Sequence, residues 1–423
     1  MGFPLSTTGA TRRGVFVILD GLGDLPVPAL GGRTPLEAAA TPNLDRLAAT
    51  GRFGLVDPIA EGVVPNTHTG VGLLLGLHPD QAPRLSRGPV EAAGAGYSLG
   101  PGDIAFRANL ATLERRGERF YVVDRRAGRI TADAAELAAG LRDIDLGDGV
   151  TGHFVATDQH RGALVFSGEG LGAAVSDTDP GDRRAPDWLR PCVAREPGSQ
   201  RTADKVNALI AATFERLRAH PVNARRIAAG KLPATAVITR GAGAWAAFDP
   251  VLRGRDCDAA VVAGCNTVLG LARMFGMAVI TREGFTASVD TDVEGKFAAA
   301  RAALEEHALV YVHVKAPDLF SHDFKPEGKQ AFIERVDRAL GQLAGSGALI
   351  ALAADHSTDS NTGAHTADPV PVLIHDPARA HAGPAVRFGE SACRADGNLP
   401  RQTGHAFLTR VLDALQPASS SAR

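Results

Sequence analysis

The chain has few cysteines, few aromatic residues and no long hydrophobic run. Only four of its 423 residues are cysteine and 5% are aromatic. No apolar run reaches the length of a membrane-spanning helix, and residues 15–19 near the N-terminus are too short for a signal peptide. The cysteines are widely spaced and form no CxxC pair, so we expect reduced, buried thiols in a soluble, cytoplasmic protein with no membrane partner. They are Cys192, Cys257, Cys265 and Cys393.

A surplus of charge of one sign is also missing. The formal net charge is -2, with 45 basic and 47 acidic side chains, which gives no basic footprint for nucleic acid. The chain is longer than one hydrophobic core usually serves, so we expect two domains.

Three apolar runs end at acidic residues. Residues 15–19 precede Asp20, residues 309–314 precede Asp318, and residues 348–354 precede Asp355. Such runs are typical of buried parallel strands. Ligands of open α/β sheets bind beyond the carboxyl ends of the strands, so we expect these three carboxylates to meet at one edge of a sheet.

Other segments complete an α/β pattern. Thr41 is a candidate cap for a helix that begins at Pro42, and the apolar residues between 332 and 343 share one helical face. Residues 110–230 mix short strands (120–123 and 163–166) with charged helices, and residues 177–199 are rich in turn formers. We therefore predict a core formed by residues 1–109 and 231–423 and an inserted cap formed by residues 110–230.

Histidines accompany the carboxylates at spacings that suit metal binding. His356 follows Asp355 directly, and His322 follows Asp318 by four positions, so that one turn can place both on one cation. We interpret His365 as the third ligand beside Asp318 and His322. Taken alone, Asp20 is at least as consistent with a turn carboxylate that caps a helix, and His365 with a structural histidine.

The segment PNTHTG supplies a candidate nucleophile. A threonine hydroxyl is a poor nucleophile at neutral pH unless a base or a metal activates it, and Thr67 and Thr69 are both available. The alternative is that both hydroxyls cap the following helix. Hard cations held by Asp and His side chains beside a hydroxyl indicate phosphoryl transfer, which also requires cationic side chains for the substrate. The candidates are Arg87, Arg107, Arg125, Arg126, Arg161, Arg240 and Lys315.

Ten motifs resemble, in the same order, those of the archaeal-type cofactor-independent phosphoglycerate mutases, which belong to the alkaline-phosphatase superfamily. They are DGLGD, GGRTPLEAAATPNLDRLA, SRGPVEAAGAG, GDIAFRANLAT, DRRAGRI, HPVNARR, TRGAG, VHVKAPD, DHS and HTADPVPVLI. The resemblance covers nearly the whole chain. It implies an alkaline-phosphatase-like core with a mainly parallel sheet flanked by helices, plus an inserted smaller α/β cap domain.

The resemblance also implies two divalent metal ions. One would be held by Asp20, Asp355, His356 and Thr67, and the other by Asp318, His322 and His365. Such ligands suit Mn²⁺ or Zn²⁺, with Mg²⁺, Co²⁺ and Fe²⁺ as alternatives. The substrate would be a small phosphorylated or phosphonylated hydroxy acid, bound by the arginines, Lys315, Asp124 and His68. The sequence does not indicate an oligomeric state.

One stretch departs from the family pattern. Where the family reads GSDTAHLA with a serine nucleophile, this chain reads NTHTGVGL, which places Thr67 at the nucleophile, His68 in place of an aspartate and Val71 in place of a histidine. We predict a phosphomutase that acts through a phospho-Thr67 intermediate. The alternatives are a metal-dependent phosphatase or phosphodiesterase on the same scaffold, and a metal-binding homologue without turnover.

Overall fold

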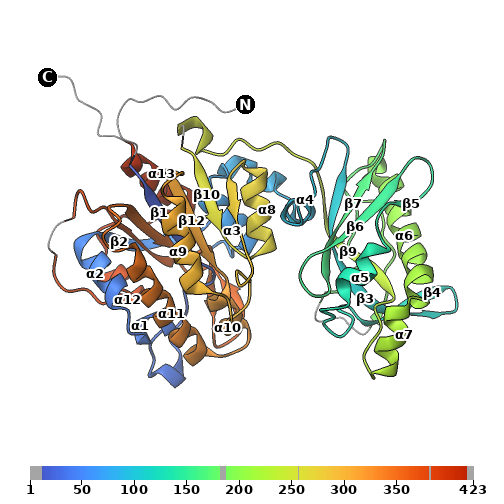
Figure 1. The fold of residues 1–423 in the computed structure, drawn as a ribbon, viewed down its shortest axis with the longest axis horizontal. Helices are drawn as coiled ribbons and strands as arrows, with labels where there is room; N and C mark the ends of the chain where they lie inside the picture. The colour runs from blue at the N-terminus through green and yellow to red at the C-terminus, as the bar shows by residue number, and fades with distance from the viewer. Residues whose placement is uncertain (1–11, 182–186, 256, 381–382, 417–423) are drawn as a thin grey trace. The chain divides into compact units, whose positions relative to one another are not determined.

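The chain folds into two compact units in the computed structural model, which describes residues 12–181, 187–255, 257–380 and 383–416 (Figure 1). Unit 1 combines Met1–Ala82 with Phe248–Arg423, and unit 2 is Pro83–Ala247. Unit 2 extends beyond the predicted cap of residues 110–230 at both ends. The reason is strand pairing: β3 (Ile104–Arg116) pairs with β9 (Ala236–Ala244), so both strands belong to the sheet of unit 2.

Unit 1 is built on an eight-stranded, mainly parallel sheet. Its order is β11 (Ala278–Ile280), β10 (Ala259–Val262), β12 (Leu309–Val314), β1 (Gly14–Leu19), β13 (Leu349–Ala353), β16 (Val370–His375), β2 (Arg52–Asp57) and β17 (Gln402–Thr403). Only β16 runs antiparallel to its neighbours in this sheet. Every residue of β1, β12 and β13 is buried, which explains their continuous apolar sequences. The predicted strands at 15–19, 309–314 and 348–354 are confirmed.

Helices flank this sheet. They are α1 (Pro35–Ala38), α2 (Pro42–Thr50), α3 (Thr67–Leu74), α8 (Asn266–Met274), α9 (Val293–Ala303), α10 (Ala316–His322), α11 (Pro326–Leu340), α12 (Glu390–Ala395) and α13 (Gly404–Leu415). In one group α9 packs on β10 and β12, and α11 packs on α9, α1 and α2; in another, α3 contacts α8 and α13. The mainly parallel sheet flanked by helices that was predicted for the core is therefore confirmed.

The start of α2 differs from the prediction in its cap. Thr41 is the N-cap residue, but its side chain makes no capping hydrogen bond. The Asp337 carboxylate on α11 instead accepts hydrogen bonds from the backbone N–H of Leu44 at 2.8 Å and of Asn43 at 3.2 Å. A buried carboxylate from a neighbouring helix therefore replaces the local cap.

A small hairpin stands at the carboxyl ends of the central strands. It pairs β14 (Ser357–Asp359) with β15 (Ala364–Thr366), and Thr358 lies opposite His365. Isolated bridges tie Ser357 to Leu22 and Gly23, just after β1. The hairpin thus follows Asp355 and His356 and brings His365 to the same edge of the sheet.

Unit 2 contains an antiparallel sheet in which β3 pairs with β4, β7 and β9. Its other strands and its helices are β4 (Arg119–Asp124), β5 (Ile144–Asp145), β6 (Thr151–Ala156), β7 (Arg161–Ser167), β8 (Asp187–Trp188), α4 (Arg87–Gly94), α5 (Ala134–Ala139), α6 (Gln200–Arg218) and α7 (Pro221–Ala228). The helix α6 packs on β9 over a separate core that includes Phe106, Phe154 and Phe166. The strands predicted at 120–123 and 163–166 are confirmed.

Two sequence expectations concern burial and the membrane. Cys257 is half-buried and the other three cysteines are buried. Among the described residues, no helix is long and apolar enough to cross a bilayer.

Candidate active site

Three buried carboxylates meet at the carboxyl edge of the unit 1 sheet. Asp20 follows β1, Asp318 lies on α10 just after β12, and Asp355 follows β13; each is at most 1% exposed. Asp20, Asp355 and His356 form one group in which the ligand atoms lie within 4.8 Å of one another, and Asp318, His322 and His365 form a second. The structure therefore brings together the two sets of three that the resemblance implies.

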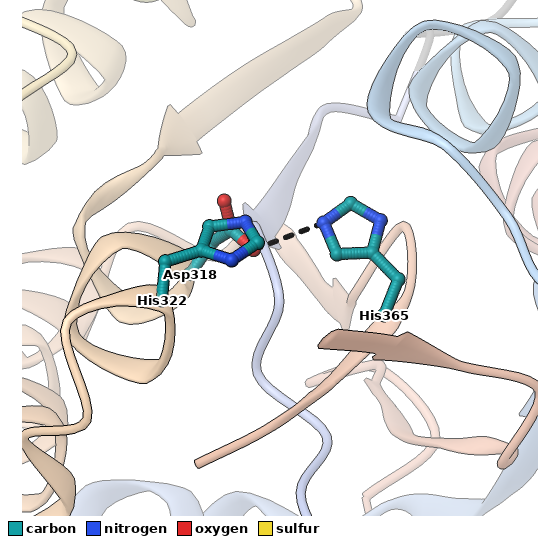
Figure 2. A group of neighbouring side chains, drawn as sticks. All are labelled: Asp318, His322 and His365. Carbon is teal, nitrogen blue, oxygen red and sulfur yellow. Dashed lines mark ion pairs between the residues drawn. The ribbon is translucent and has the colours of Figure 1, made fainter. Parts of the chain in front are cut away.

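The second group draws on two elements. Asp318 and His322 lie one turn apart on α10, and His365 reaches toward them from the hairpin (Figure 2). The Asp318 Oδ1 atom is 3.2 Å from Nε2 of His322 and 3.4 Å from Nε2 of His365. The spacing of four along α10 thus gives the shared position that the sequence predicted.

The first group is completed by a hydroxyl. The His356 Nε2 atom is 3.3 Å from both Asp20 Oδ1 and Asp355 Oδ2, and 3.5 Å from the Thr67 Oγ1 atom. The Lys315 ammonium group bridges the two groups, because Nζ lies 2.7 Å from Asp20 Oδ1 and 2.7 Å from Asp318 Oδ2.

Two of the histidines are oriented by backbone carbonyls. His322 Nδ1 lies 2.7 Å from the Gly363 carbonyl oxygen, and His365 Nδ1 lies 3.1 Å from that of Pro65. A carbonyl oxygen can only accept, so Nδ1 carries a proton in each ring, and in the neutral ring Nε2 is left with a lone pair for a cation. Metal-binding histidines typically show this arrangement.

Burial and charge act against each other at these carboxylates. Burial favours the neutral form of Asp20, but the charge of Lys315 and a hydrogen bond from His313 outweigh it, so the pKa of Asp20 lies below its ordinary value. The pKa of Asp318 is lowered in the same way by Lys315 and the neighbouring histidines. Burial and the charge of Asp20 raise the pKa of Asp355 well above its ordinary value. Three ionised carboxylates at this site would therefore carry more negative charge than Lys315 alone balances.

The donor set fits two divalent cations. Lys315 pairs with Asp20 and Asp318, and Asp355 Oδ2 is buried without a hydrogen-bond partner among the described residues. Carboxylate oxygens and imidazole nitrogens in sets of three match Mn²⁺ and Zn²⁺. A cation beside each group would satisfy the Asp355 oxygen and balance the remaining charge.

Thr67 is the first residue of α3, which packs tightly against the first group. Asn66 caps this helix by accepting a hydrogen bond from the Thr69 N–H, so capping does not account for the Thr67 hydroxyl. That hydroxyl lies 3.2 Å from Lys315 Nζ. Gly70 permits the close approach, since a Cβ atom there would lie 2.3 Å from the Asp355 carbonyl oxygen. Val71 is fully buried.

The predicted arginines gather in unit 2. Arg107 on β3 is directly opposite Arg240 on β9, and Arg161 on β7 is opposite Asn109, two positions further along β3. Burial, together with Arg87, Arg240 and Arg161, lowers the pKa of Arg107 to about 9. The positive charge around Arg107 favours the binding of an anion.

The residue that holds Arg125 in this cluster was not among the predicted site residues. Asp179 lies within residues 177–199, which the sequence marked only as rich in turn formers, yet its buried carboxylate accepts two hydrogen bonds from Arg125, at 2.7 and 2.6 Å. Asn109 donates a third at 2.9 Å. Asp124 accepts hydrogen bonds from the N–H groups of Arg126 and Gly128, so its contacts lie within its own turn and its role toward substrate stays a prediction.

Two histidines in motifs lie outside both groups. His313, within VHVKAPD, holds Asp20 Oδ2 at 3.0 Å through Nε2, and the only signal for it was a polar residue inside an apolar strand. His405, within TGHAF, donates to the Leu77 carbonyl oxygen at 3.1 Å. The first supports a candidate ligand, and the second holds α13 to the loop after α3.

Comparison with known proteins identifies the family. Residues 48–223 match the family model described as 2,3-bisphosphoglycerate-independent phosphoglycerate mutase. The protein of that name from Ignicoccus hospitalis is 42% identical over 90% of this chain and 92% of its own length, and one from Methanothermobacter thermautotrophicus is 39% identical over 95% and 98%. This chain belongs to that family.

Solved structures agree with this assignment. The cofactor-independent phosphoglycerate mutase from Thermoplasma acidophilum aligns with a TM-score of 0.68 and 31% identity, over 96% of this chain and 100% of its own. A protein from Pyrococcus horikoshii aligns with a TM-score of 0.79 and 29% identity, over 98% and 100%. The family resemblance that the ten motifs indicated is thus confirmed. The predicted fold is confirmed as well.

Proposed function

We propose that this protein is a metal-dependent phosphomutase that interconverts 2- and 3-phosphoglycerate through a phosphorylated Thr67. The relatives that carry the phosphoglycerate mutase name support the substrate class. The observation that carries the mechanism is the position of one hydroxyl: Thr67 Oγ1 lies beside His356 of the first group and beside Lys315, which contacts both groups.

We assign one divalent cation to Asp20, Asp355, His356 and Thr67, and the other to Asp318, His322 and His365. Mn²⁺ or Zn²⁺ suits these ligands best, with Mg²⁺, Co²⁺ and Fe²⁺ as alternatives. When bound, such cations make a hydroxyl more acidic and stabilise the charge on the attacking and leaving oxygens of an in-line phosphoryl transfer.

The side chains of this chain then act in two symmetrical steps. In the first, Thr67 Oγ1 loses its proton and attacks phosphorus, the bond from phosphorus to the glycerate oxygen breaks, and that oxygen takes up a proton. Lys315 and the N–H groups at the start of α3 donate to the phosphoryl oxygens. In the second step the other glycerate hydroxyl loses its proton and attacks phosphorus, the bond from phosphorus to Thr67 Oγ1 breaks, and Thr67 Oγ1 takes up a proton.

The arginine cluster of unit 2 is the binding site that we propose for the anionic groups of the substrate. Guanidinium groups bind carboxylates and phosphates with paired hydrogen bonds, and the mutual repulsion around Arg107 is relieved when an anion binds. Arg125 is already aligned by Asp179. We assign Arg87, Arg107, Arg125, Arg126, Arg161, Arg240, Lys315, Asp124 and His68 to substrate binding.

Phosphorus NMR tests the reaction directly. The purified protein is incubated with Mn²⁺ and 3-phosphoglycerate, and the expected result is the 2-phosphoglycerate resonance at equilibrium without growth of inorganic phosphate. Steady release of phosphate would contradict the mutase and identify a phosphatase. An unchanged spectrum across several divalent metals and phosphorylated hydroxy acids would identify a homologue without turnover.

A further inference from the structure

The hydroxyl of Thr358 stands between the two groups of candidate ligands. Its Oγ1 atom is 2.8 Å from Asp318 Oδ1, which belongs to the second group, and 3.0 Å from Nδ1 of His356, which belongs to the first. The side chain is fully buried on β14. One atom that is not itself a candidate ligand therefore contacts a ligand of each group.

The direction of both hydrogen bonds follows from the number of protons. A hydroxyl has one proton to donate, and an ionised carboxylate can only accept, so Thr358 donates to Asp318. Thr358 must then accept from His356, which places the imidazole proton on Nδ1. Nε2 of His356 is left with its lone pair facing Asp20 and Asp355.

The backbone of Thr358 is held as firmly as its hydroxyl. Its N–H donates to the Gly23 carbonyl oxygen at 2.9 Å, its own carbonyl accepts from Lys329 Nζ at 3.3 Å, and it lies opposite His365 in the hairpin. Gly21 packs against it: a Cβ atom there would lie 2.7 Å from Thr358 Oγ1, and the Gly21 φ of +64° is itself unfavourable for other residues. The surrounding structure thus fixes where this hydroxyl points.

We propose that Thr358 is a positioning residue that sets the tautomer and orientation of His356 and couples the geometry of the two metal sites. Thr358 is assigned no contact with substrate, so it acts only through His356 and Asp318. The inference rests on the metal sites of the proposed function and goes beyond them, because it names the group that makes the two sites depend on each other.

Thr358→Val is the decisive variant, because valine keeps the shape of threonine and removes the hydroxyl. Loss of that hydroxyl leaves Nδ1 of His356 without its acceptor and Asp318 without one donor. Thr358→Ser keeps the hydroxyl. Thr362→Val is the matched control, since the Thr362 hydroxyl lies in the same hairpin and donates to Asp359, which belongs to neither group.

The first measurement is the tautomer of His356 by nitrogen-15 NMR of the metal-free protein at a pH where the ring is neutral. Wild type, Thr358→Ser and Thr362→Val are expected to carry the proton on Nδ1, and Thr358→Val is expected to shift it toward Nε2. A wild-type His356 protonated on Nε2 would overturn the inference, and this result is available even if the valine variant does not fold.

The second measurement is isothermal titration calorimetry of each metal-free protein with Mn²⁺ alone. Thr358→Val is expected to weaken both binding events by about 10- to 100-fold, whereas Thr358→Ser and Thr362→Val stay within about 3-fold of wild type. Wild-type affinity in the valine variant, or loss at one site alone, would overturn the coupling role. A wild-type protein that binds no Mn²⁺ would contradict the proposed metal sites themselves.

Discussion

At the scale of single residues, the proposed chemistry depends on whether the Thr67 hydroxyl is available to attack phosphorus. The Asn66 side chain caps α3, so the Thr67 hydroxyl is available beside His356 and Lys315. We predict that Thr67→Ala lowers kcat by at least about 10³-fold and abolishes phosphorylation of the protein, because the nucleophile is removed. Thr67→Ser keeps the hydroxyl and is expected to retain both.

Intact-mass spectrometry after mixing with 3-phosphoglycerate measures the phosphorylated fraction in each variant. Thr69→Ala is the control, since Thr69 lies two residues along the same helix. A phosphorylated Thr67→Ala protein would show that another group is the nucleophile.

A second single residue, Asp179 in unit 2, orients Arg125 through two hydrogen bonds. Burial opposes its ionisation, but hydrogen bonds from Arg125 and the Gly181 N–H outweigh this effect and lower its pKa. We predict that Asp179→Asn raises KM for phosphoglycerate by about 10-fold or more with a smaller change in kcat, because Arg125 loses its paired acceptor. Steady-state kinetics measure this, with the exposed Glu169→Gln as control. An unchanged KM would remove Arg125 from the proposed substrate site.

At the scale of elements, a buried ion pair fastens the segments that carry the ligands. Lys329 on α11 donates to Asp24 at 2.8 Å, to Ser321 on α10 at 3.0 Å and to the carbonyl of Thr358 on β14 at 3.3 Å. Neither Lys329 nor Asp24 has an exposed side chain. The pair therefore joins the turn after β1, the helix of Asp318 and the hairpin of His365.

We predict that Lys329→Met lowers the free energy of unfolding by about 3 to 5 kcal/mol, because it leaves the Asp24 charge buried without its partner. The double variant Asp24→Asn/Lys329→Met is expected to lose less than Lys329→Met alone, since no unpaired charge remains. Urea denaturation measures both, with the exposed Lys325→Met as control. If the single and double variants lost the same free energy of unfolding, the two side chains would stabilise the fold through packing and not because Lys329 compensates the charge of Asp24.

Elements that follow from local pattern were predictable, whereas contacts between distant segments were not. The strand before Asp20 and the spacing of Asp318 and His322 could be inferred because apolar runs and helical periodicity are local properties. The cap on α2 comes from Asp337, which lies almost 300 residues further along the chain, so Thr41 looked sufficient. Likewise the domain boundary was missed because β3 pairs with a strand that begins at Ala236.

The site shows the same division. The six candidate Asp and His ligands come together beyond the carboxyl ends of β1, β12 and β13, and their residue types alone suggested metals. Thr358 and Asp179 could not be assigned, because a threonine in a short strand and an aspartate in a turn have ordinary local explanations. Their roles depend on His356 and Arg125, which reach them only in the folded chain.

At the scale of the whole molecule, one buried acid makes stability depend on pH. Burial, opposed in part by a hydrogen bond from Thr34, raises the pKa of Glu390 from 4.5 to about 7. Between these values the folded chain holds a proton that the unfolded chain has lost, so stability falls as pH rises from about 4.5 to 7. The loss is on the order of 3 kcal/mol, and Glu390→Gln is expected to remove it.

Thermal unfolding of Glu390→Gln and wild type between pH 5 and 8 measures the difference, with the exposed Glu118→Gln as control. The two curves are expected to diverge as pH rises, with the glutamine variant more stable at pH 8. Parallel curves would show that Glu390 is ionised in the folded chain near its ordinary pKa.

Removal of metal should affect the two units differently, because the six candidate ligands belong to unit 1 and each unit has its own core. A ligand that binds only the folded state stabilises it, so bound Mn²⁺ should slow local opening of the segments that supply its ligands. We predict that hydrogen exchange slows with Mn²⁺ at residues 316–322 and 355–366, whereas β3, β7 and β9 exchange at the same rates. Mass spectrometry of peptides from protein with Mn²⁺ or with chelator measures this, and sodium chloride at equal ionic strength controls for screening. Equal slowing in β3 would mean that the metal ions bind outside the two groups of ligands.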